Sequence, residues 1–492
     1  MDAIDAACMT RLDLESQKYI KSIDLMESAG ASMADIIMSL NPKNVLIILG
    51  SGGNAGDGLV VGRYLLLNGI NTTIYKISEI KNEDSKINLL KYKGKEINDL
   101  NNISEYDLIV DAILGNGLNK PLKDNYIDVI NIVNRSNAYK VSLDVPSGIN
   151  SSNGLSMGAF VKANLTITVE YPKLGFFLND GLEAVSELKI VKCGMNKTDE
   201  LIHINEIDDF KDIIPLRHRN TNKSSFGRAS IVAGSYNYPG ASLISYNALL
   251  SFMMGVGYSR LYVPKRLYEI YALKYPEIIV DDIQDNDGFI KYSKDDLDKI
   301  LKSSDSISIG MGMGVSEDLY KSIDYLIKSF DKKIIIDADG INSIAKYGVD
   351  ILNNHKADII LTPHPKEFSR LTGLGVNEIL ENPVKYATDF SKKYNVTLIL
   401  KGASSVITDG VNTAISIFGS TGLAKGGSGD ALSGILAGSA AYIKKTAFDV
   451  SSFACFMLGY SAQISNIPYE SVRISDIIKE VPNTWKMLEM KK

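Results

Sequence analysis

Residues 45–58 read VLIILGSGGNAGDG, in which an apolar run, Val45–Gly50, passes directly into a glycine-rich turn that carries Asp57. A short apolar run rich in β-branched residues is typical of a buried strand, and glycines let the backbone approach a phosphate. Gly58–Asn68 then has the apolar spacing of a helix packed on a sheet. Strand, turn and helix in this order predict a parallel α/β unit with a ligand at the turn.

A second glycine-rich turn lies far downstream and differs in chemistry. Gly426–Asp430 leads into the helical pattern Ala431–Ala441. Because the two turns differ and lie in different halves, they predict two nucleotide-handling sites rather than one site built twice. A chain of 492 residues is also too long for one ordinary core, so we expect two or three domains.

The composition of the chain limits the classes of protein to which it can belong. Apolar residues make up 45% and charged residues 23%, a soluble globular balance, and the net charge of −5 gives no footprint for nucleic acid or anionic membrane. Cys8, Cys193 and Cys455 are too few and scattered for a disulfide framework. The first residues lack a signal pattern, and no apolar run approaches the roughly 18 residues of a spanning helix. We therefore expect a cytoplasmic protein with no nucleic-acid or membrane partner.

Strand-like runs alternate with helical stretches in both halves, which predicts an α/β protein with parallel sheets covered on both faces. The runs of the first half are Val45–Leu49, Asn71–Ile77, Leu108–Ala112, Lys140–Asp144, Leu165–Val169 and Lys189–Val191. Those of the second half are Ala229–Ala233, Ser259–Val263, Ser306–Ile309, Ile334–Asp337, Asp358–Leu361 and Leu398–Lys401, followed by a hairpin of Val406–Thr408 and Ala414–Ile417. The polar segment Ile202–Ser225 separates the halves, so we place a boundary near residue 212, with domains 1–212 and 213–492.

Three polar turns follow strands of the first half. They are Gly52–Gly58, Asp111–Leu118 and Asp144–Gly148. Ligands of open parallel sheets bind outside the carboxyl ends of the strands, so three such turns predict a binding site there. The structural alternative is that the glycine turn only joins strand to helix, Asp111 caps a turn and Asp144 ends a strand.

Five segments of the first half resemble, in order, those of NAD(P)H-hydrate epimerases. They are Met26–Gly30, Gly50–Gly58, Asp111–Leu118, Asp144–Gly148 and Tyr171–Gly175. The epimerase loop usually reads Gly-Pro-Gly-Asn-Asn-Gly-Gly-Asp-Gly, whereas here Gly53 replaces the first Asn and Ala55 replaces a Gly. One side-chain contact to the substrate is therefore expected to be missing. The resemblance implies a Rossmann-like, doubly wound parallel sheet.

The resemblance also implies which residues form this site. The substrate contacts would be Gly53, Asn54, Ala55, Gly56, Asp57, Gly115, Asn116, Gly117, Leu118, Asn119, Lys120, Pro121 and Asp144. A potassium ion would be held by Asn54, Asp111 and Ser147, whose oxygen ligands suit a hard cation. Inverting the hydroxyl at C6 of the reduced nicotinamide needs proton transfer, and one placed carboxylate provides about 10²–10⁴-fold. We assign this role to Asp144, with Asp57 as the alternative.

The downstream glycine turn suggests phosphoryl chemistry. Backbone N–H groups at the start of the helix after Gly427 can hold a transferring phosphoryl group. Asp430, on the first turn, can accept a proton from an attacking hydroxyl. The structural alternative is an acidic residue that merely suits the positive end of the helix dipole.

Other polar residues follow strands of the second half. Lys401–Ser405 follows one strand and favours nucleotide binding. His364 lies between two prolines at the end of another strand, where it either contacts substrate or shapes the turn. Asp337 and Asp339 follow a third strand and either line the site or cap the next helix.

This half resembles the ribokinase-like superfamily and, within it, the NAD(P)H-hydrate dehydratases. The matching segments are Lys223–Ser235 with Gly240-Ala241, Gly310–Gly314, Thr362–Phe368, Lys401–Ser405 and Gly426–Gly434. Met311 stands where the family usually has proline, and Lys366 where it often has glycine. By resemblance, the hydrate would contact Ala241, Gly314, His364 and Asp430. The nucleotide would be held by Lys401, Gly402, Ala403, Ser404, Ser405 and Gly429.

Together, the two resemblances imply a bifunctional repair enzyme for damaged nicotinamide nucleotides. The first half would epimerise R- and S-NADHX and NADPHX, and the second would dehydrate the S form with ADP as co-substrate, giving AMP and phosphate. Magnesium is expected with the nucleotide, and a homo-oligomer (tetramer or larger) is expected. One alternative makes the second half a kinase of a small molecule. Another makes the first half a non-catalytic binding or scaffold module.

Overall fold

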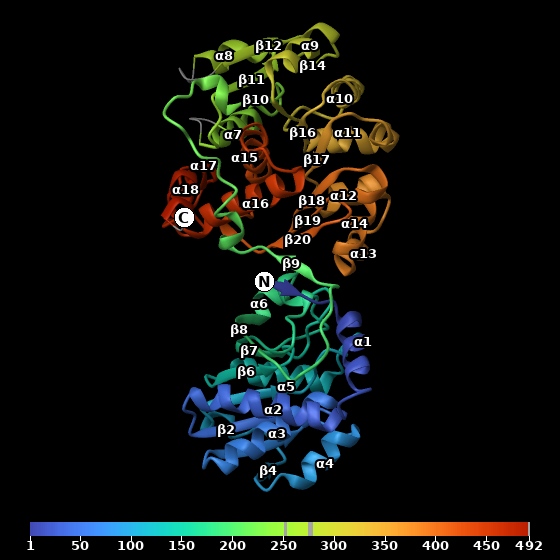
Figure 1. Ribbon diagram of the computed structural model, residues 1–492, viewed down its shortest axis with the longest axis vertical. Coiled ribbons are helices and arrows are strands. Elements are labelled where there is room, and N and C mark those ends of the chain that lie inside the picture. The colour runs from blue at the N-terminus through green and yellow to red at the C-terminus, as the bar shows by residue number, and fades with distance from the viewer. Residues whose placement is uncertain (250–252, 274–278, 491–492) are drawn as a thin grey trace. The chain divides into compact units, whose positions relative to one another are not determined.

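The computed structural model describes residues 1–249, 253–273 and 279–490, and Figure 1 shows its helices and strands. The chain divides into two compact units, one of Asp2–His203 and one of Met1 with Ile204–Lys492. The expected boundary near residue 212 lies a few residues beyond this division. No helix in the described ranges is both long and apolar enough to cross a membrane.

The first unit is built on a seven-stranded parallel sheet with the order β4-β3-β2-β5-β6-β7-β8. Its strands are β2 (Asn44–Leu49), β3 (Asn71–Lys76), β4 (Lys95–Ile97), β5 (Leu108–Ala112), β6 (Tyr139–Leu143), β7 (Ala163–Val169) and β8 (Val185–Val191). Its helices are α1 (Ala6–Ser16), α2 (Ser22–Ser39), α3 (Gly53–Leu67), α4 (Glu83–Lys91), α5 (Asp124–Arg135) and α6 (Gly181–Ala184). The short strand β1 (Asp2–Ala3) pairs antiparallel with β9 (Ile202–Ile204).

The apolar run of β2 is buried on both faces. Val45, Ile47 and Leu49 pack in one core with α2 and α3, while Leu46 and Ile48 pack in another with α5. Side chains alternate between the faces of a strand, so a run buried on both sides must be apolar throughout. The predicted doubly wound parallel sheet is therefore confirmed.

The strand order reverses between β2 and β5, since β3 and β4 lie on one side of this pair and β6 to β8 on the other. The carboxyl ends of strands at such a reversal form the crevice where α/β sheets bind ligands. Helix α3 begins at Gly53, earlier than the predicted Gly58, so much of the glycine turn forms the first turn of that helix. The sequence also missed β4, a short and largely exposed edge strand.

The sheet of the second unit runs in the order β20-β19-β18-β17-β16-β15-β10-β11-β12. Its strands are β10 (Arg228–Val232), β11 (Tyr258–Pro264), β12 (Ile279–Ile283), β15 (Ser306–Ile309), β16 (Lys333–Ile336), β17 (Asp358–Leu361), β18 (Thr397–Leu400), β19 (Ser405–Thr408) and β20 (Thr413–Ser416). In this sheet, neighbouring strands from β18 through to β12 are parallel, and the predicted hairpin of β19 and β20 is confirmed as antiparallel. The sequence missed β12 at the edge.

Two buried helices form the centre of this unit's core. Helix α15 (Ser428–Tyr442) is buried from Ala431 onward, and α16 (Ala447–Gln463) packs against it. Small alanine, glycine and serine side chains let α15 lie close to α7 (Pro239–Leu249) and to β10. The other α-helices of this unit that the structure describes are α8 (Tyr268–Ala272), α9 (Lys294–Ser303), α10 (Glu317–Ser329), α11 (Asp339–Tyr347), α12 (Pro365–Thr372), α13 (Val376–Glu381), α14 (Pro383–Tyr394), α17 (Ile474–Ile478) and α18 (Val481–Met490).

Candidate active sites

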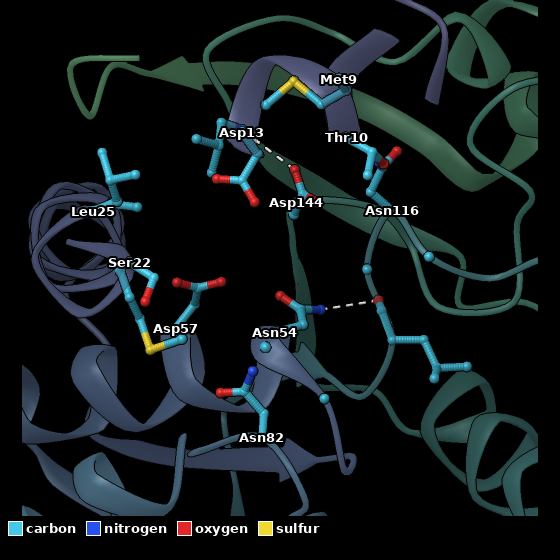
Figure 2. Close-up of a pocket in the computed structure, with 18 of the residues that line it drawn as sticks. Met9, Thr10, Asp13, Ser22, Leu25, Asn54, Asp57, Asn82, Asn116 and Asp144 are labelled. Carbon is cyan, nitrogen blue, oxygen red and sulfur yellow. Dashed lines mark hydrogen bonds between the residues drawn. The ribbon is translucent and has the colours of Figure 1, made fainter. Parts of the chain in front are cut away.

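A cavity of about 580 Å³ lies at the carboxyl ends of the strands of the first unit. Figure 2 shows Asp57, Asn54, Asp144 and Asp13 around this space. Among the predicted substrate contacts, its lining includes Gly53, Asn54, Asp57, Gly115, Asn116, Gly117, Leu118, Asn119, Lys120 and Asp144. The lining does not include Ala55, Gly56 or Pro121, of which the first two are buried in α3 and the last is exposed on the loop before α5.

Asp144 follows β6 in an unusual backbone conformation, with φ of +62°. Its Oδ1 lies 2.5 Å from the Nζ of Lys173, which is fully buried. The hydroxyl of Thr168 and the backbone N–H of Val169 also donate to Oδ1, at 3.3 and 3.5 Å. A non-glycine residue in the left-handed region is a strained feature that clusters at functional sites. This environment holds the carboxylate in one orientation at the wall of the cavity.

Asp57, on the first turns of α3, has the opposite environment. Its carboxyl group makes no hydrogen bond or ion pair with any residue that the structure describes. Burial raises the pKa of Asp57 well above its usual value, and the carboxylates of Asp144 and Asp13 raise it further. The two aspartates therefore differ, because the Lys173 ammonium bonds directly to Asp144, whereas it lowers the pKa of Asp57 only from a distance and less than burial and the two carboxylates raise it.

The three predicted potassium ligands lie together in a buried hydrogen-bond network. Both oxygens of Asp111 accept hydrogen bonds, from the Ser142 hydroxyl and from the N–H and hydroxyl of Ser147, among others. Asn54 Nδ2 donates to the carbonyl of Leu114 at 2.9 Å, and Ser147 Oγ lies 3.1 Å from the same carbonyl. Asn54 Oδ1 is buried without a hydrogen-bond partner among the described residues. This orphaned acceptor belongs to a residue linked to Ser147 through the Leu114 carbonyl, and oxygen atoms of this kind suit an alkali cation.

In the second unit, Asp430 lies on the first turn of α15, directly after the glycine-rich turn. Its side chain makes no hydrogen bond or ion pair within the described ranges. Burial and the nearby carboxylate of Asp337 raise the pKa of Asp430 to about 7. A carboxyl group poised near neutral pH is suited to accept a proton in catalysis.

A buried ion pair lies directly beneath this turn. Lys401 Nζ lies 2.9 Å from Oδ1 of Asp337, and the Ser433 hydroxyl donates to the other oxygen at 2.7 Å. A Cβ atom built at Gly429 would lie 3.2 Å from Lys401 Nζ, so a side chain at that position would crowd the pair. Burial alone would raise the pKa of Asp337, but the Lys401 ammonium and these hydrogen bonds lower it. Asp337 is thus a paired anion and not a helix cap.

The other predicted residues of the second unit lie on strand ends and helix starts. His364 caps α12, because its Nδ1 accepts hydrogen bonds from the N–H groups of Lys366 and Glu367. This matches the structural alternative, although the ring is still half-exposed. Gly314 donates its N–H to Asp339, the first residue of α11.

The predicted nucleotide contacts and the remaining substrate contact are placed as follows. Gly402 and Ala403 are exposed after β18, Ser404 is buried, Ser405 begins β19, and Ala241 lies on the first turn of α7.

Sequence reasoning missed three residues that the structure brings to these sites. Lys173 belongs to a segment that carries the epimerase resemblance, but its role depends on a partner 29 residues away in the chain. Asp13 reaches the cavity from α1, which no motif pointed to. Ser433, one turn beyond Asp430, bonds to Asp337. In the described ranges, no three histidine, cysteine, aspartate or glutamate side chains gather as a metal-binding group.

Comparisons with known proteins agree with the two units. The family model "YjeF-related protein N-terminus" matches residues 22–175, and the model "NAD(P)H-hydrate dehydratase" matches residues 229–483. The bifunctional NAD(P)H-hydrate repair enzyme Nnr of Dictyoglomus turgidum is 32% identical over 498 residues, covering 95% of each chain. The similar enzyme of Thermofilum pendens is 33% identical over 451 residues, covering 87% of this chain and 85% of that one.

A solved structure supports the fold of the second unit. The ADP/ATP-dependent NAD(P)H-hydrate dehydratase from Bacillus subtilis, co-crystallized with ATP/Mg²⁺, matches with a TM-score of 0.51 at 23% identity. The match covers 58% of this chain and 99% of that chain. Taken with the sequence matches over nearly the whole chain, this places the protein in the family of bifunctional NAD(P)H-hydrate repair enzymes.

Proposed function

We propose that residues 1–212 epimerise NADHX and NADPHX and that residues 213–492 dehydrate the S epimer with ADP. The observation that supports this most directly is that each unit has its own aspartate at its own strand-end site, Asp144 at the cavity and Asp430 at the start of α15. The relatives named as bifunctional repair enzymes span both units, which agrees with two activities in one chain. Assembly into a homo-oligomer and a cytoplasmic location stay predictions.

In the first unit, Asp144 transfers the proton that epimerisation requires. The hydrate has a hydroxyl on C6 beside the ring nitrogen, and inversion needs the C–O or C–N bond to open and reclose. The rigid carboxylate of Asp144 provides an acceptor and donor of fixed orientation at the cavity wall. Asp57 is the second candidate, since its carboxyl group, which has no hydrogen-bond partner in the part of the chain that the structure describes, lines the same cavity.

A potassium ion would be held in this unit by Asn54, Asp111 and Ser147. Oδ1 of Asn54, which has no hydrogen-bond partner among the described residues, supports this assignment, and Asp111 supplies the single formal charge. A site with one carboxylate suits a monovalent ion better than a divalent ion, which would seek more carboxylates. When bound, the ion would fix three strand-end loops relative to one another.

In the second unit, Asp430 takes the proton of the C6 hydroxyl, whose oxygen attacks the terminal phosphoryl group of ADP. AMP leaves, the lone pair of the ring nitrogen then expels phosphate from C6, and loss of a proton from C5 forms the C5–C6 double bond that restores the reduced nicotinamide. Phosphate is a far better leaving group than hydroxide. The free N–H groups at the start of α15 stabilise the charge on the transferring group.

The nucleotide is held beside α15 by the loop from Lys401 to Ser405 and by Gly429. The exposed backbone of Gly402 and Ala403 is accessible to a ligand, whereas Lys401 is engaged with Asp337. Magnesium usually binds through one or two carboxylates plus substrate phosphates, which is the arrangement we propose for ADP. When bound, it would offset the negative charge of the phosphates.

The test is a time course of the purified protein with mixed NADHX epimers, with and without ADP. We expect the epimers to interconvert without ADP. With ADP, both are expected to disappear as NADH, AMP and phosphate form. A stable phosphorylated product would instead support a small-molecule kinase, and epimers that never interconvert would support a non-catalytic first unit.

A further inference from the structure

Lys173 is unusual because its charged side chain is completely buried in the first unit. It follows β7 in the segment Tyr171–Gly175, and the backbone of Ile4 fixes this segment through two hydrogen bonds. Ile4 donates to the carbonyl of Pro172 at 2.9 Å and accepts from the N–H of Leu174 at 2.8 Å. Burying a lysine is costly unless its charge is paired and its donors are satisfied.

All three donors of the Lys173 ammonium have acceptors. They are Oδ1 of Asp144 at 2.5 Å, the Thr168 hydroxyl at 2.8 Å and the carbonyl of Val169 at 3.1 Å. An ammonium group has three N–H bonds, so none remains for a substrate. Lys173 can therefore act on a reaction only through Asp144.

The two oxygens of Asp144 have different surroundings. Oδ1 receives Lys173, Thr168 and the N–H of Val169, whereas Oδ2 has no hydrogen-bond donor in the part of the chain that the structure describes. Oδ2 faces Gly115, where an added Cβ would lie 3.4 Å from it. Because Gly115 also lines the cavity, Oδ2 is the oxygen available to a ligand.

We propose that Lys173 is a positioning residue for epimerisation, which holds Asp144 through Oδ1 so that Oδ2 handles the substrate proton. The proposal rests on the epimerase function proposed above. Oδ2 accepts the proton of the C6 hydroxyl while the bond between C6 and the ring nitrogen breaks, which leaves a carbonyl at C6. The proton then passes to the ring nitrogen. Reclosure on the other face of the carbonyl reverses these transfers, so Asp144 ends as it began.

The Lys173–Asp144 ion pair also favours cleavage of the C–N bond over cleavage of the C–O bond. A carboxylate bonded to an ammonium is arranged to accept a proton, which starts opening of the C–N bond. Loss of hydroxide would instead need a proton donated to the hydroxyl. The hydroxyl oxygen should therefore stay with the substrate and not exchange with bulk water at the rate of epimerisation.

The experiment compares Lys173→Met with Lys162→Met, an exposed lysine of the same unit that also pairs with a carboxylate, Glu183. For Lys173→Met we expect kcat of epimerisation to fall about 10²-fold, the lower range for a general acid–base contribution, with little change in KM. Its solvent deuterium isotope effect should rise, because proton transfer becomes slower relative to other steps. Dehydration of pure S epimer by the same preparation should be unchanged, as should both activities of Lys162→Met.

A second variant keeps the proposal testable if Lys173→Met does not fold. Gly115→Ala leaves the ion pair intact and sets a methyl group 3.4 Å from Oδ2, so its kcat should also fall. Wild-type kcat in either folded variant, or a loss confined to KM in Lys173→Met, would overturn the positioning role. Absence of epimerisation in the wild-type enzyme would instead refute the proposed function itself.

Discussion

The two sites contain the same residue types, an aspartate and a lysine, in different arrangements. In the first unit, Lys173 contacts Asp144 directly at 2.5 Å. In the second, Lys401 contacts Asp337 at 2.9 Å, and Asp430 has no direct counter-charge among the described residues. Burial and the Asp337 carboxylate then raise the pKa of Asp430 to about 7.

This difference matches the two proposed reactions. Epimerisation returns its proton to the substrate, so it benefits from a carboxylate of fixed orientation that is the same at the start and the end of the reaction. Dehydration starts with removal of a proton, for which a base with a pKa near the working pH is effective. In the first unit the lysine pairs with the aspartate that reacts, and in the second it pairs with a neighbouring aspartate. The reacting carboxylate is therefore held by an ion pair in the first site and not in the second.

The largest expected effect is the pH dependence of dehydration. Asp430 must be ionised to accept a proton, so kcat/KM should fall about tenfold for each pH unit below its pKa of about 7. The measurement is the initial rate of NADH formation from pure S epimer between pH 5 and 9. A rate that is flat down to pH 5 would exclude Asp430 as the base.

Asp337, whose carboxylate lies near Asp430, provides a control on this pH profile. Asp337→Asn removes the carboxylate that raises the pKa of Asp430 and leaves the Lys401 ammonium in place. The acidic limb should therefore move to lower pH, although the variant will be less stable because the partly buried Lys401 loses its partner. An acidic limb that stays in place or moves to higher pH would show that Asp337 does not raise the pKa of Asp430.

A several-fold effect is expected from the cation in the first unit. Epimerisation should be faster in potassium than in a bulky organic cation at constant ionic strength, because the ion would fix the loops that supply Asn54, Asp111 and Ser147. Dehydration of the S epimer should be measured in the same buffers for comparison. Equal epimerisation rates in potassium, sodium and the organic cation would refute a functional cation there.

The smallest effect is expected from separating the units. A protein of residues 1–212 retains β9, which pairs with β1, together with the whole seven-stranded sheet and its cavity. It should fold and epimerise at close to the rate of the full chain, since each unit has its own core. Circular dichroism and the epimerisation assay check this, and an unfolded fragment would show that the units depend on each other.

Much of the fold could be predicted from the sequence because its central strands are short, apolar and bounded by glycine or polar residues. Leu108–Ala112, Ser306–Ile309 and Asp358–Leu361 have the predicted bounds. Lys95–Ile97 was missed because a short, exposed edge strand carries no apolar signal. The start of α3 was placed late because glycine-rich sequence is typical of turns, although here it begins a helix.

The site was less predictable than the fold. Motifs identified Asp144 and Asp430, since both follow strands or glycine turns. Lys401 was predicted only as a nucleotide contact and Lys173 was given no role, because a lysine in a sequence is ordinarily a solvated residue and its ion-pair partner cannot be assigned. Lys401 pairs with a residue 64 positions away, and only the folded sheet brings the two together.

The central claim is that one chain contains two independent sites, and reciprocal variants test it most directly. Asp430→Asn and Asp144→Asn should each be given mixed NADHX epimers with ADP, and both epimers should be followed over time. We expect Asp430→Asn to interconvert the epimers without forming NADH. Asp144→Asn should convert the S epimer to NADH and leave the R epimer behind. Loss of both activities in either folded variant would contradict the two-site account.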